Sequence, residues 1–413
     1  MRRCEFIRSV VEVCRRQGEE VWEKAKAVKD RASMAVFERA CAGLGMEVGR
    51  EAFAKGVEAI EARRRRTRCA DCGCVMERSV RSRTYYTLVG QVSVSRWYYY
   101  CRRCGVGLAP LDEWIEGEGS QVSLGVEEKI CQLASEMGYE RAGKKLKALC
   151  GLEVSSTTVA RHATRWGQHA CRRPMKGCEW SGSVDLSIDA AKVNTIDGGW
   201  RDMKIAVFEE PGGAGRRYSV HIGHHERWGR ALRRTAGALG VRHTSQMRIW
   251  GDGADWIWKV AQVNFPGARC IVDYYHVMEN LSEYGRQIYG EGSAELSTWL
   301  HSIGHTLKDD GGRAVHDEIR AGRPGPRRHW QVWTKVLKYL KARLDKMDYP
   351  AYRLEGLDIG SGVVESACKQ VIESRLKGGR RWLRDNVLSM AAMRSLFLAE
   401  QWDSFWQTQL QCA

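Results

Sequence analysis

The sequence predicts an α+β protein with several domains, on the basis of three observations. Two pairs of cysteines have C-x-x-C spacing, a helical segment is interrupted by a short glycine-containing turn, and a longer segment alternates strand patterns with helix patterns. At 413 residues the chain exceeds one typical domain and has room for roughly two to four. Hydrophobic residues make up 43% of it, which is enough for sizeable cores and excludes a disordered chain.

The charge balance points to a polyanionic partner. Sixty-six lysines and arginines stand against 50 aspartates and glutamates, which gives a net charge of +16. Such an excess favours nucleic acid first and an anionic membrane surface second. No apolar run approaches the ~20 residues that span a bilayer, and the first residues lack the apolar core of a signal peptide. We therefore expect an intracellular protein, cytoplasmic and associated with the nucleoid, with no membrane partner.

Residues 1–66 have the pattern of an N-terminal helical segment with many charged positions. The segment closes on the run EARRRRTR, which contains the four consecutive arginines Arg63–Arg66. Such a run is either a solvated basic face or, beside a metal motif, a set of phosphate contacts.

Residues 67–120 are predicted to form a zinc ribbon. Two turns, Cys69/Cys72 and Cys101/Cys104, flank the stretch TYYTLVGQVSVSRWYYY, whose alternation predicts a β-hairpin. Tetrahedral zinc takes two thiolates from each of two such turns, so we expect one structural Zn²⁺. Cys74 is a spare thiol that could replace Cys72. The fifteen cysteines of a chain without a secretory signal favour free thiols and a metal site over a disulfide framework.

Residues 121–178 are predicted to form a helix-turn-helix DNA-binding domain. The segments VEEKICQLASEMG and YERAGKKLKALC have helical patterns, Gly151 suits the end of the second helix, and Ser155 suits the N-cap of a third. The third helix opens with serine and threonine and carries Arg161, His162 and Arg165, which are therefore candidate DNA contacts.

From residue 179 to residue 276 the pattern is that of an α/β domain. SVDLSIDAAKVNT, WRDMKIAVFE and RYSVHIG predict three strands joined by turns, and a helix, the strand MRIW, a second helix and the strand in ARCIVDYYH follow. The order β-β-β-α-β-α-β, three hairpin-linked strands followed by α/β crossovers, is the ribonuclease H-like layout.

Three carboxylates are candidates for a metal-dependent catalytic site. In this layout a carboxylate on the first strand lies beside one at the end of the fourth, and Asp189 and Asp252 occupy these places; Asp185 is the main competitor of Asp189. Glu365, at the edge of the apolar stripe of a later helix, is the natural third ligand, or else only an ion-pair partner of Lys369. Carboxylates suit Mg²⁺ or Mn²⁺, and two such ions can activate an attacking oxygen and stabilise a leaving one.

The rest of the chain is predicted to be helical. Residues 277–355 form an all-helical insertion, and residues 356–413 form the C-terminal helices of the catalytic domain. Four cations after Glu365 are candidates for phosphate contact, or for a plain solvated face: Arg375, Lys377, Arg380 and Arg381.

Three segments resemble bacterial insertion-sequence transposases of the Kra type, relatives of the Mutator-like elements: SIDAAKVNT…GGWRDMKIAV, WGDGADWIWKVAQVNFPGARCIVDYYHVMENL and IGSGVVESACKQVIESRLKGGRRW. The cysteine pairs and GLEVSSTTVARH also fit that family, so the resemblance covers roughly residues 65–405. It implies a DDE triad of Asp189, Asp252 and Glu365, and a D-x-x-H element whose members are Asp273 and His276. These two either support catalysis or cap the following helix. The chain departs from the family at Ala190, where Asp-Gly is usual.

The resemblance implies a transposase that binds the ends of its insertion sequence and target DNA, acts as at least a homodimer, and cuts and joins DNA strands with metal ions. Two alternatives stay open. One is a transposase-derived protein that binds double-stranded DNA without cutting it, which three retained acids argue against. The other is a ribonuclease H-like nuclease that does not join strands, which would have little need of a zinc ribbon, a helix-turn-helix and an insertion.

Overall fold

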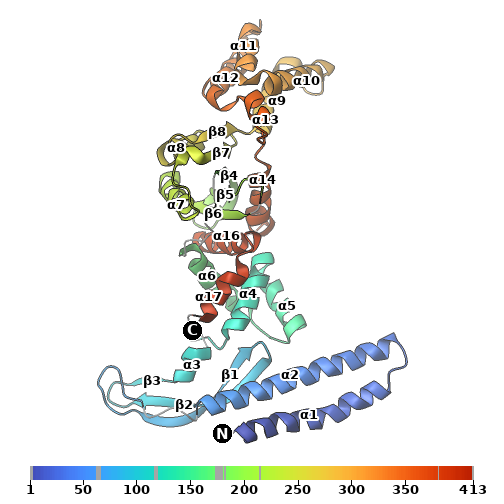
Figure 1. The fold of residues 1–413 in the computed structure, drawn as a ribbon, viewed down its shortest axis with the longest axis vertical. Helices are drawn as coiled ribbons and strands as arrows, with labels where there is room; N and C mark the ends of the chain where they lie inside the picture. Colours follow the sequence, from blue (N-terminus) through green and yellow to red (C-terminus); the bar gives the residue numbers. More distant parts are fainter. Residues whose placement is uncertain are drawn as a thin grey trace. The chain divides into compact units, whose positions relative to one another are not determined.

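The computed structural model describes residues 3–61, 67–115, 120–172, 180, 183–213, 215–379 and 381–411. The chain is an α+β protein with a three-stranded and a five-stranded sheet (Figure 1). It divides into two compact units, Met1–Ala163 with Trp406–Ala413, and Thr164–Phe405. Two sets of candidate phosphate contacts, Arg63–Arg66 and Arg380, lie outside the described residues.

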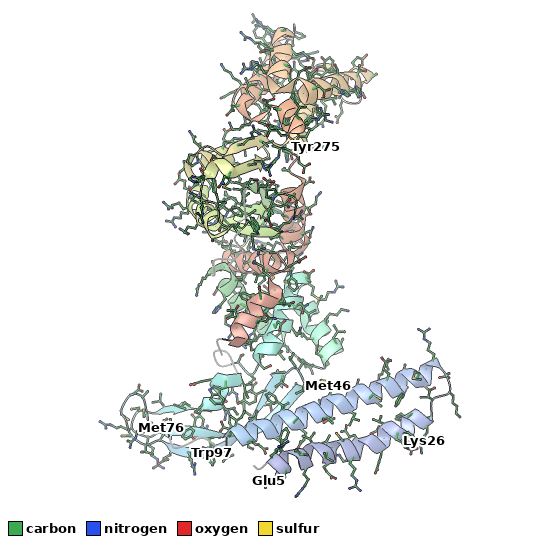
Figure 2. All side chains as sticks on the ribbon, in the orientation of Figure 1. Glu5, Lys26, Met46, Met76, Trp97 and Tyr275 are labelled. Carbon is green, nitrogen blue, oxygen red and sulfur yellow. The ribbon has the colours of Figure 1, made fainter. Side chains whose placement is uncertain are left out.

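The first unit combines long helices with the small sheet. Its elements are α1 (Arg3–Lys26), α2 (Arg31–Glu61), β1 (Glu77–Thr87), β2 (Gly90–Cys101), β3 (Val106–Leu108), α3 (Pro110–Ile115), α4 (Leu124–Glu136), α5 (Tyr139–Cys150) and the start of α6 (Ser156–Arg172). The strands pair antiparallel in the order β1-β2-β3, as the predicted hairpin requires. The end of α2 packs on this sheet because Val57 joins Tyr85 and Val92 in one buried cluster. Figure 2 labels Met76, which directly precedes β1, and Trp97 of β2; both pack in one cluster with Cys69 and Cys101.

The turn before α6 has the predicted caps. Gly151 follows α5 in the left-handed conformation, with φ 64°, which glycine adopts without strain. The hydroxyl of Ser155 accepts a hydrogen bond from the amide of Thr158 at 3.1 Å and so caps the first turn of α6. Both sequence predictions are confirmed.

The second unit is built on the five-stranded sheet. Its elements are β4 (Val184–Thr195), β5 (Gly199–Glu209), β6 (Arg216–Ile222), α7 (His225–Ala238), β7 (Met247–Gly251), α8 (Asp255–Asn264), β8 (Arg269–Val272), α9 (Tyr274–Tyr289), α10 (Ala294–Asp309), α11 (Gly311–Ala321), α12 (Trp330–Lys341), α13 (Tyr349–Leu354), α14 (Gly362–Ala367), the π-helical segment Cys368–Glu373, α15 (Ser374–Leu376), α16 (Arg384–Leu398) and α17 (Trp402–Gln411). The expected succession of three strands, helix, strand, helix and strand is observed. The strand order is β6-β5-β4-β7-β8.

Strand direction separates the two halves of this sheet. β5 is antiparallel to both β4 and β6, whereas β7 is parallel to β4 and β8 is parallel to β7. Alternate residues of β4, such as Leu186 and Ile188, join Trp228 of α7 and Val260 of α8 in the main core. α7 and α8 cover one face of the sheet, and α14 with the π-helical segment contacts β4 and β5 on the other (Figure 1).

The helices α9–α13, which occupy the predicted insertion, have a second core that also includes Trp250 of β7 and Val272 of β8. Val277 and Leu281 of α9 pack with Ile303, Val315 and Leu340 from the helices that follow. This second core lets the helical segment between β8 and α14 bury its own apolar faces and packs it on the β7–β8 side of the sheet.

Candidate functional site

Four thiols of the first unit converge on one point. The sulfur atoms of Cys69, Cys72, Cys101 and Cys104 all lie within 4.8 Å of one another. Zinc binds sulfur at ~2.3 Å, which separates the four sulfurs of a tetrahedral site by about 3.8 Å. The cysteine group could therefore hold a metal ion such as zinc, and the donor set is the one that structural zinc prefers.

Two matching turns deliver these thiols. The amide of Gly73 donates to the carbonyl of Cys69 at 2.9 Å, and the amide of Gly105 donates to the carbonyl of Cys101 at 2.8 Å. Both glycines have positive φ, 71° and 69°, which residues with a Cβ rarely adopt. Each C-x-x-C pair is therefore followed by a glycine that closes the same tight turn.

Cys74 is not a member of this group of four. Its carbonyl accepts a hydrogen bond from the amide of Cys69 at 2.9 Å. Its own backbone N–H is the main cause of a lowered pKa at Cys72, which favours the thiolate form that binds metal. The spare cysteine thus supports the turn through its backbone.

In the second unit, a row of aspartates follows the last residues through which β4, β7 and β8 pair in parallel. Ile188 of β4 pairs with Gly251 of β7, which pairs with Val272 of β8. The residues that come next in the chain are Asp189, Asp252 and Asp273. Since β4, β7 and β8 run parallel, this aspartate row lies at one level across the three strands, at the edge formed by the carboxyl ends of β7 and β8. In open α/β sheets, ligands bind at the carboxyl ends of the strands.

Asp189 is held by its own strand and by the helix that covers it. Its Oδ1 accepts from the amide of Ala190 at 2.7 Å, and its Oδ2 accepts from the thiol of Cys368 at 3.2 Å. Burial raises the pKa of Asp189 against the effect of the Cys368 hydrogen bond, and the charge of Asp252 adds to the rise. The register that pairs Ile188 with Gly251 places Asp189 and Asp252 side by side.

Asp252 lies in a turn that a residue of the helical insertion holds in place. Its Oδ1 accepts from the amide of Ala254 at 2.7 Å. The buried guanidinium of Arg343 donates to the carbonyl of Gly253 at 2.6 Å and to Asp255 at 2.7 Å. Gly253 has φ +95°, and a Cβ there would meet the Tyr339 hydroxyl at 2.9 Å. Sequence reasoning missed Arg343 because nothing in the pattern links two segments about 90 residues apart.

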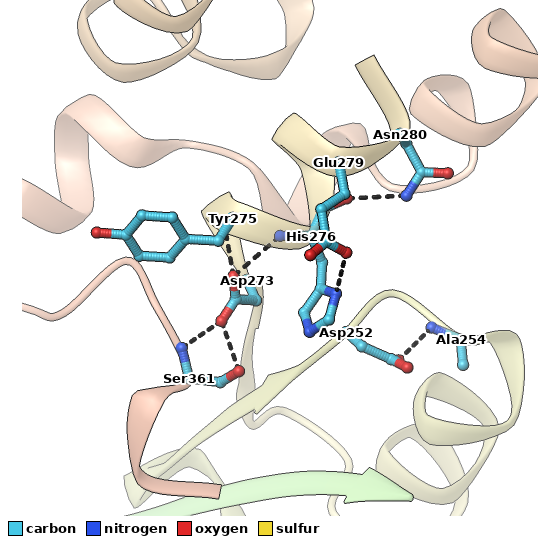
Figure 3. A network of polar contacts seen from close by, with 8 residues as sticks. All are labelled: Asp252, Ala254, Asp273, Tyr275, His276, Glu279, Asn280 and Ser361. Atoms are coloured by element: carbon cyan, nitrogen blue, oxygen red, sulfur yellow. Dashed lines mark hydrogen bonds and ion pairs between the residues drawn. The ribbon is translucent and has the colours of Figure 1, made fainter. Parts of the chain in front are cut away.

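Asp273 caps a helix and anchors another segment (Figure 3). Its Oδ1 accepts from the amides of Tyr275 and His276 at 2.6 and 3.1 Å, so it is the N-cap of α9. Its Oδ2 accepts from the amide and the hydroxyl of Ser361, which immediately precedes α14. The capping interpretation, one of the two that the sequence left open, accounts for this buried carboxylate.

His276 lies at the same edge of the sheet. Its Nδ1 is 3.1 Å from a carboxylate oxygen of Glu279, and its ring lies near Asp252 in Figure 3. A positive charge on this ring favours the ionised form of Asp189 and so lowers the pKa of that carboxyl.

Glu365 is paired with a lysine. Its Oε1 accepts from Nζ of Lys369 at 2.6 Å, and its side chain is 62% exposed. Among the residues that the structure describes, the cysteine group is the one set of three or more ligands close enough to share a metal ion. Asp189, Asp252 and Glu365 are thus not such a set. Glu365 is nevertheless one helical turn from Cys368, whose thiol reaches Asp189.

The helix that carries Glu365 changes its winding directly after it. The apolar stripe predicted for this helix is buried: Val364, Ala367, Cys368 and Val371. From Cys368 to Glu373 the backbone is π-helical, a feature that occurs frequently at functional sites. The 3.6-residue periodicity of the sequence gives no signal for this change, and sequence reasoning missed both it and the Cys368 contact.

Asp185, the alternative first acid, lies at the start of β4, whereas Asp189 lies in the middle of the strand. Arg248 of β7 donates to its two carboxylate oxygens at 2.5 and 2.8 Å. It is four residues away from the aspartate row.

The candidate DNA contacts on α6 divide into exposed and buried positions. Arg161 is exposed, and the guanidinium of Arg165 lies 5.3 Å from the ring centroid of Trp166. His162 is only 1% exposed, and its Nδ1 lies 2.9 Å from the equally buried carboxylate of Glu127 on α4. The position of His162 on the core side of α6 removes it from the set of candidate DNA contacts.

The cations that follow Glu365 divide in the same way. Arg375 is buried, with its guanidinium 4.8 Å from the ring centroid of Trp382, so it too is removed from the candidate contacts. Lys377 pairs with Glu373, and Arg381 is exposed.

Comparison of the chain with protein-family models and with curated proteins found no match. In the described part of the chain, no helix has the length and apolar character needed to cross a membrane.

Proposed function

We propose that the chain is a DDE transposase whose second unit contains a ribonuclease H-like catalytic domain interrupted by α9–α13. The observation that carries the proposal is the position of Asp189 on β4 beside Asp252, which directly follows the parallel strand β7, with the helix of Glu365 packed against the same sheet. The sheet order, with three antiparallel strands followed by two parallel crossovers, supports the fold assignment.

In this proposal Asp189, Asp252 and Glu365 hold Mg²⁺ or Mn²⁺. The three carboxylates supply the hard oxygen ligands that these ions prefer, with waters and substrate phosphate completing the shell. When bound, the ions would activate water to cut a DNA strand and then the freed 3′-OH to attack target DNA. Glu365 must leave Lys369 to join them, and an ion pair as exposed as this one costs little to break because solvent screens it.

The residues around these acids have positioning roles. Arg343 fixes the turn that carries Asp252, and Cys368 fixes a carboxylate oxygen of Asp189. Asp273 joins the start of α9 to Ser361, which sets where α14 begins. His276 supplies a nearby group that can carry positive charge.

The first unit, together with the rest of α6 and two later cations of the second unit, supplies recognition in this proposal. The segment from residue 67 to residue 115 is a zinc ribbon with structural Zn²⁺ at the cysteine group, and α4–α6 form a helix-turn-helix. Arg161 and Arg165 of α6 contact the element's terminal sequences, and Lys377 and Arg381 contact phosphates. Because two ends must be cut in concert, the active form is at least a dimer.

The Glu365–Lys369 ion pair is the observation that favours the main alternative, a silent DNA-binding descendant. The deciding experiment incubates the chain with duplexes cut from the DNA that flanks its gene, a target plasmid and Mg²⁺. We expect strand cleavage and joined products from the wild type and neither from Glu365→Gln. Cleavage without joining would indicate a nuclease, and binding without cleavage by the wild type would indicate the silent descendant.

A further inference from the structure

We propose that α7 presents a phosphate-binding surface for duplex DNA. This α7 arginine face consists of Arg227, Arg230, Arg233 and Arg234. The inference rests on the proposed function, because it takes DNA to be the polyanion. It adds a sequence-independent DNA contact in the second unit to the sequence-reading contact proposed for α6.

Helical geometry gathers these arginines on the outer side of α7. Trp228 and Leu232 are buried in the core against the sheet, so the opposite side of the helix faces solvent. Arg227, Arg230 and Arg234 are exposed and follow i, i+3, i+7 spacing, which places them in one column. At 1.5 Å per residue this column is about 10 Å long.

The charge of this face is not balanced within the described residues. α7 carries four arginines and one glutamate, Glu226. None of the four arginines forms an ion pair, hydrogen bond or ring contact with another described residue. By contrast, Arg248 and Arg343 of the same unit are both bound to carboxylates. Four like charges this close repel one another, and a polyanion relieves that repulsion.

Strand register connects α7 with the aspartate row. Ile222 at the end of β6 pairs with Met203 of β5, which pairs with Ala191, two residues after Asp189. β6 runs parallel to β4, so the end of β6, where α7 begins, lies on the same side of the sheet as the aspartate row. β7 starts at the opposite side, so α7 runs back across the sheet toward it. A DNA strand held at the aspartate row can therefore continue along α7.

A groove beside α7 supplies an independent observation. It has a volume of about 550 Å³ and lies between the end of α6, β6, α7 and α16. Arg234 of α7 and Arg172 of α6 both line it, together with polar side chains that include Ser219 and His221. Cations from two elements thus face one groove, an arrangement that suits the phosphates of a backbone rather than a single small anion.

The test compares two triple variants of the full chain on a random-sequence duplex at a series of NaCl concentrations. The first variant is Arg227→Gln/Arg230→Gln/Arg234→Gln. Glutamine is a good helix former, so we expect thermal unfolding close to that of the wild type. Each phosphate contact contributes ~0.9 to the salt slope, so we expect the slope to fall by about 2 to 3 and the affinity at low salt to fall at least about tenfold.

The matched control removes the same charge from exposed arginines of α9 and α11: Arg286→Gln/Arg313→Gln/Arg320→Gln. We expect this control to keep the wild-type slope. An unchanged slope in the α7 variant, or an equal loss in the control, would overturn the inference while leaving the proposed function intact. A wild type that binds no duplex DNA would overturn both.

Discussion

The cysteine group of the first unit and the aspartate row of the second unit bring metal-binding residues together to different extents. Four thiols lie within 4.8 Å of one another, whereas Asp189 and Asp252 lie side by side while Glu365 pairs with Lys369. Zinc in a structural site is enclosed by protein ligands alone. Magnesium keeps waters and takes ligands from substrate phosphates, so its carboxylates need not converge before DNA is present.

The largest expected effect concerns the cysteine group. Structural zinc in zinc-finger peptides contributes ~10–16 kcal/mol to folding. We expect one zinc ion per wild-type chain and none in Cys101→Ser/Cys104→Ser, with loss of the β1–β2 hairpin signals by NMR. Cys270→Ser, outside the group, should keep the metal. Elemental analysis that finds equal zinc in all three proteins would show that these thiols do not bind it.

The next prediction concerns the choice of first acid. Asp189→Asn should lower metal-dependent cleavage roughly a thousandfold or more, because metal ions supply several kcal/mol of transition-state stabilisation. Asp185→Asn should retain cleavage, because Asp185 serves a structural ion pair with Arg248. Single-turnover cleavage rates at saturating protein measure both. If Asp185→Asn abolishes cleavage and Asp189→Asn retains it, the first catalytic acid is Asp185, at the start of β4.

A smaller effect is expected for the helix cap. Asp273→Ala removes the N-cap of α9 and the partner of Ser361, so the free energy of unfolding should fall by about 2 kcal/mol or more. Asp273→Asn should be milder, because asparagine also caps well. Urea unfolding checks both variants. If Asp273→Asn unfolds like the wild type but cleaves no DNA, the residue also has a catalytic role.

Much of this organisation could be predicted from the sequence where local chemistry decides the structure. The C-x-x-C turns, the caps at Gly151 and Ser155 and the succession of strands and helices along the chain depend on residues close together in the chain. His162 was not predicted correctly, because a polar residue on a basic helix gives no sign of a buried carboxylate on another helix. Arg343 and the π-helical segment depend on packing between distant segments, which periodicity does not record.

The smallest expected effect is on DNA selectivity. Arg161→Ala should reduce the preference for terminal over random DNA by ~1–3 kcal/mol, since an exposed arginine can read a base edge. His162→Ala should instead lower stability and leave the preference unchanged, because His162 is buried against Glu127. Competition binding at fixed salt separates the two. A selectivity loss in His162→Ala at unchanged stability would contradict this division of α6.

The central claim is that the aspartate row binds metal ions that cleave DNA. The most direct test is a crystal structure of the chain with terminal-repeat DNA and Mn²⁺, in which anomalous scattering locates the ions. We expect two Mn²⁺ ions ~3.5–4 Å apart at Asp189 and Asp252, with the Glu365 carboxylate turned away from Lys369 and toward the ions. Mn²⁺ absent from the aspartate row, with Glu365 still bound to Lys369 in the DNA complex, would contradict this claim.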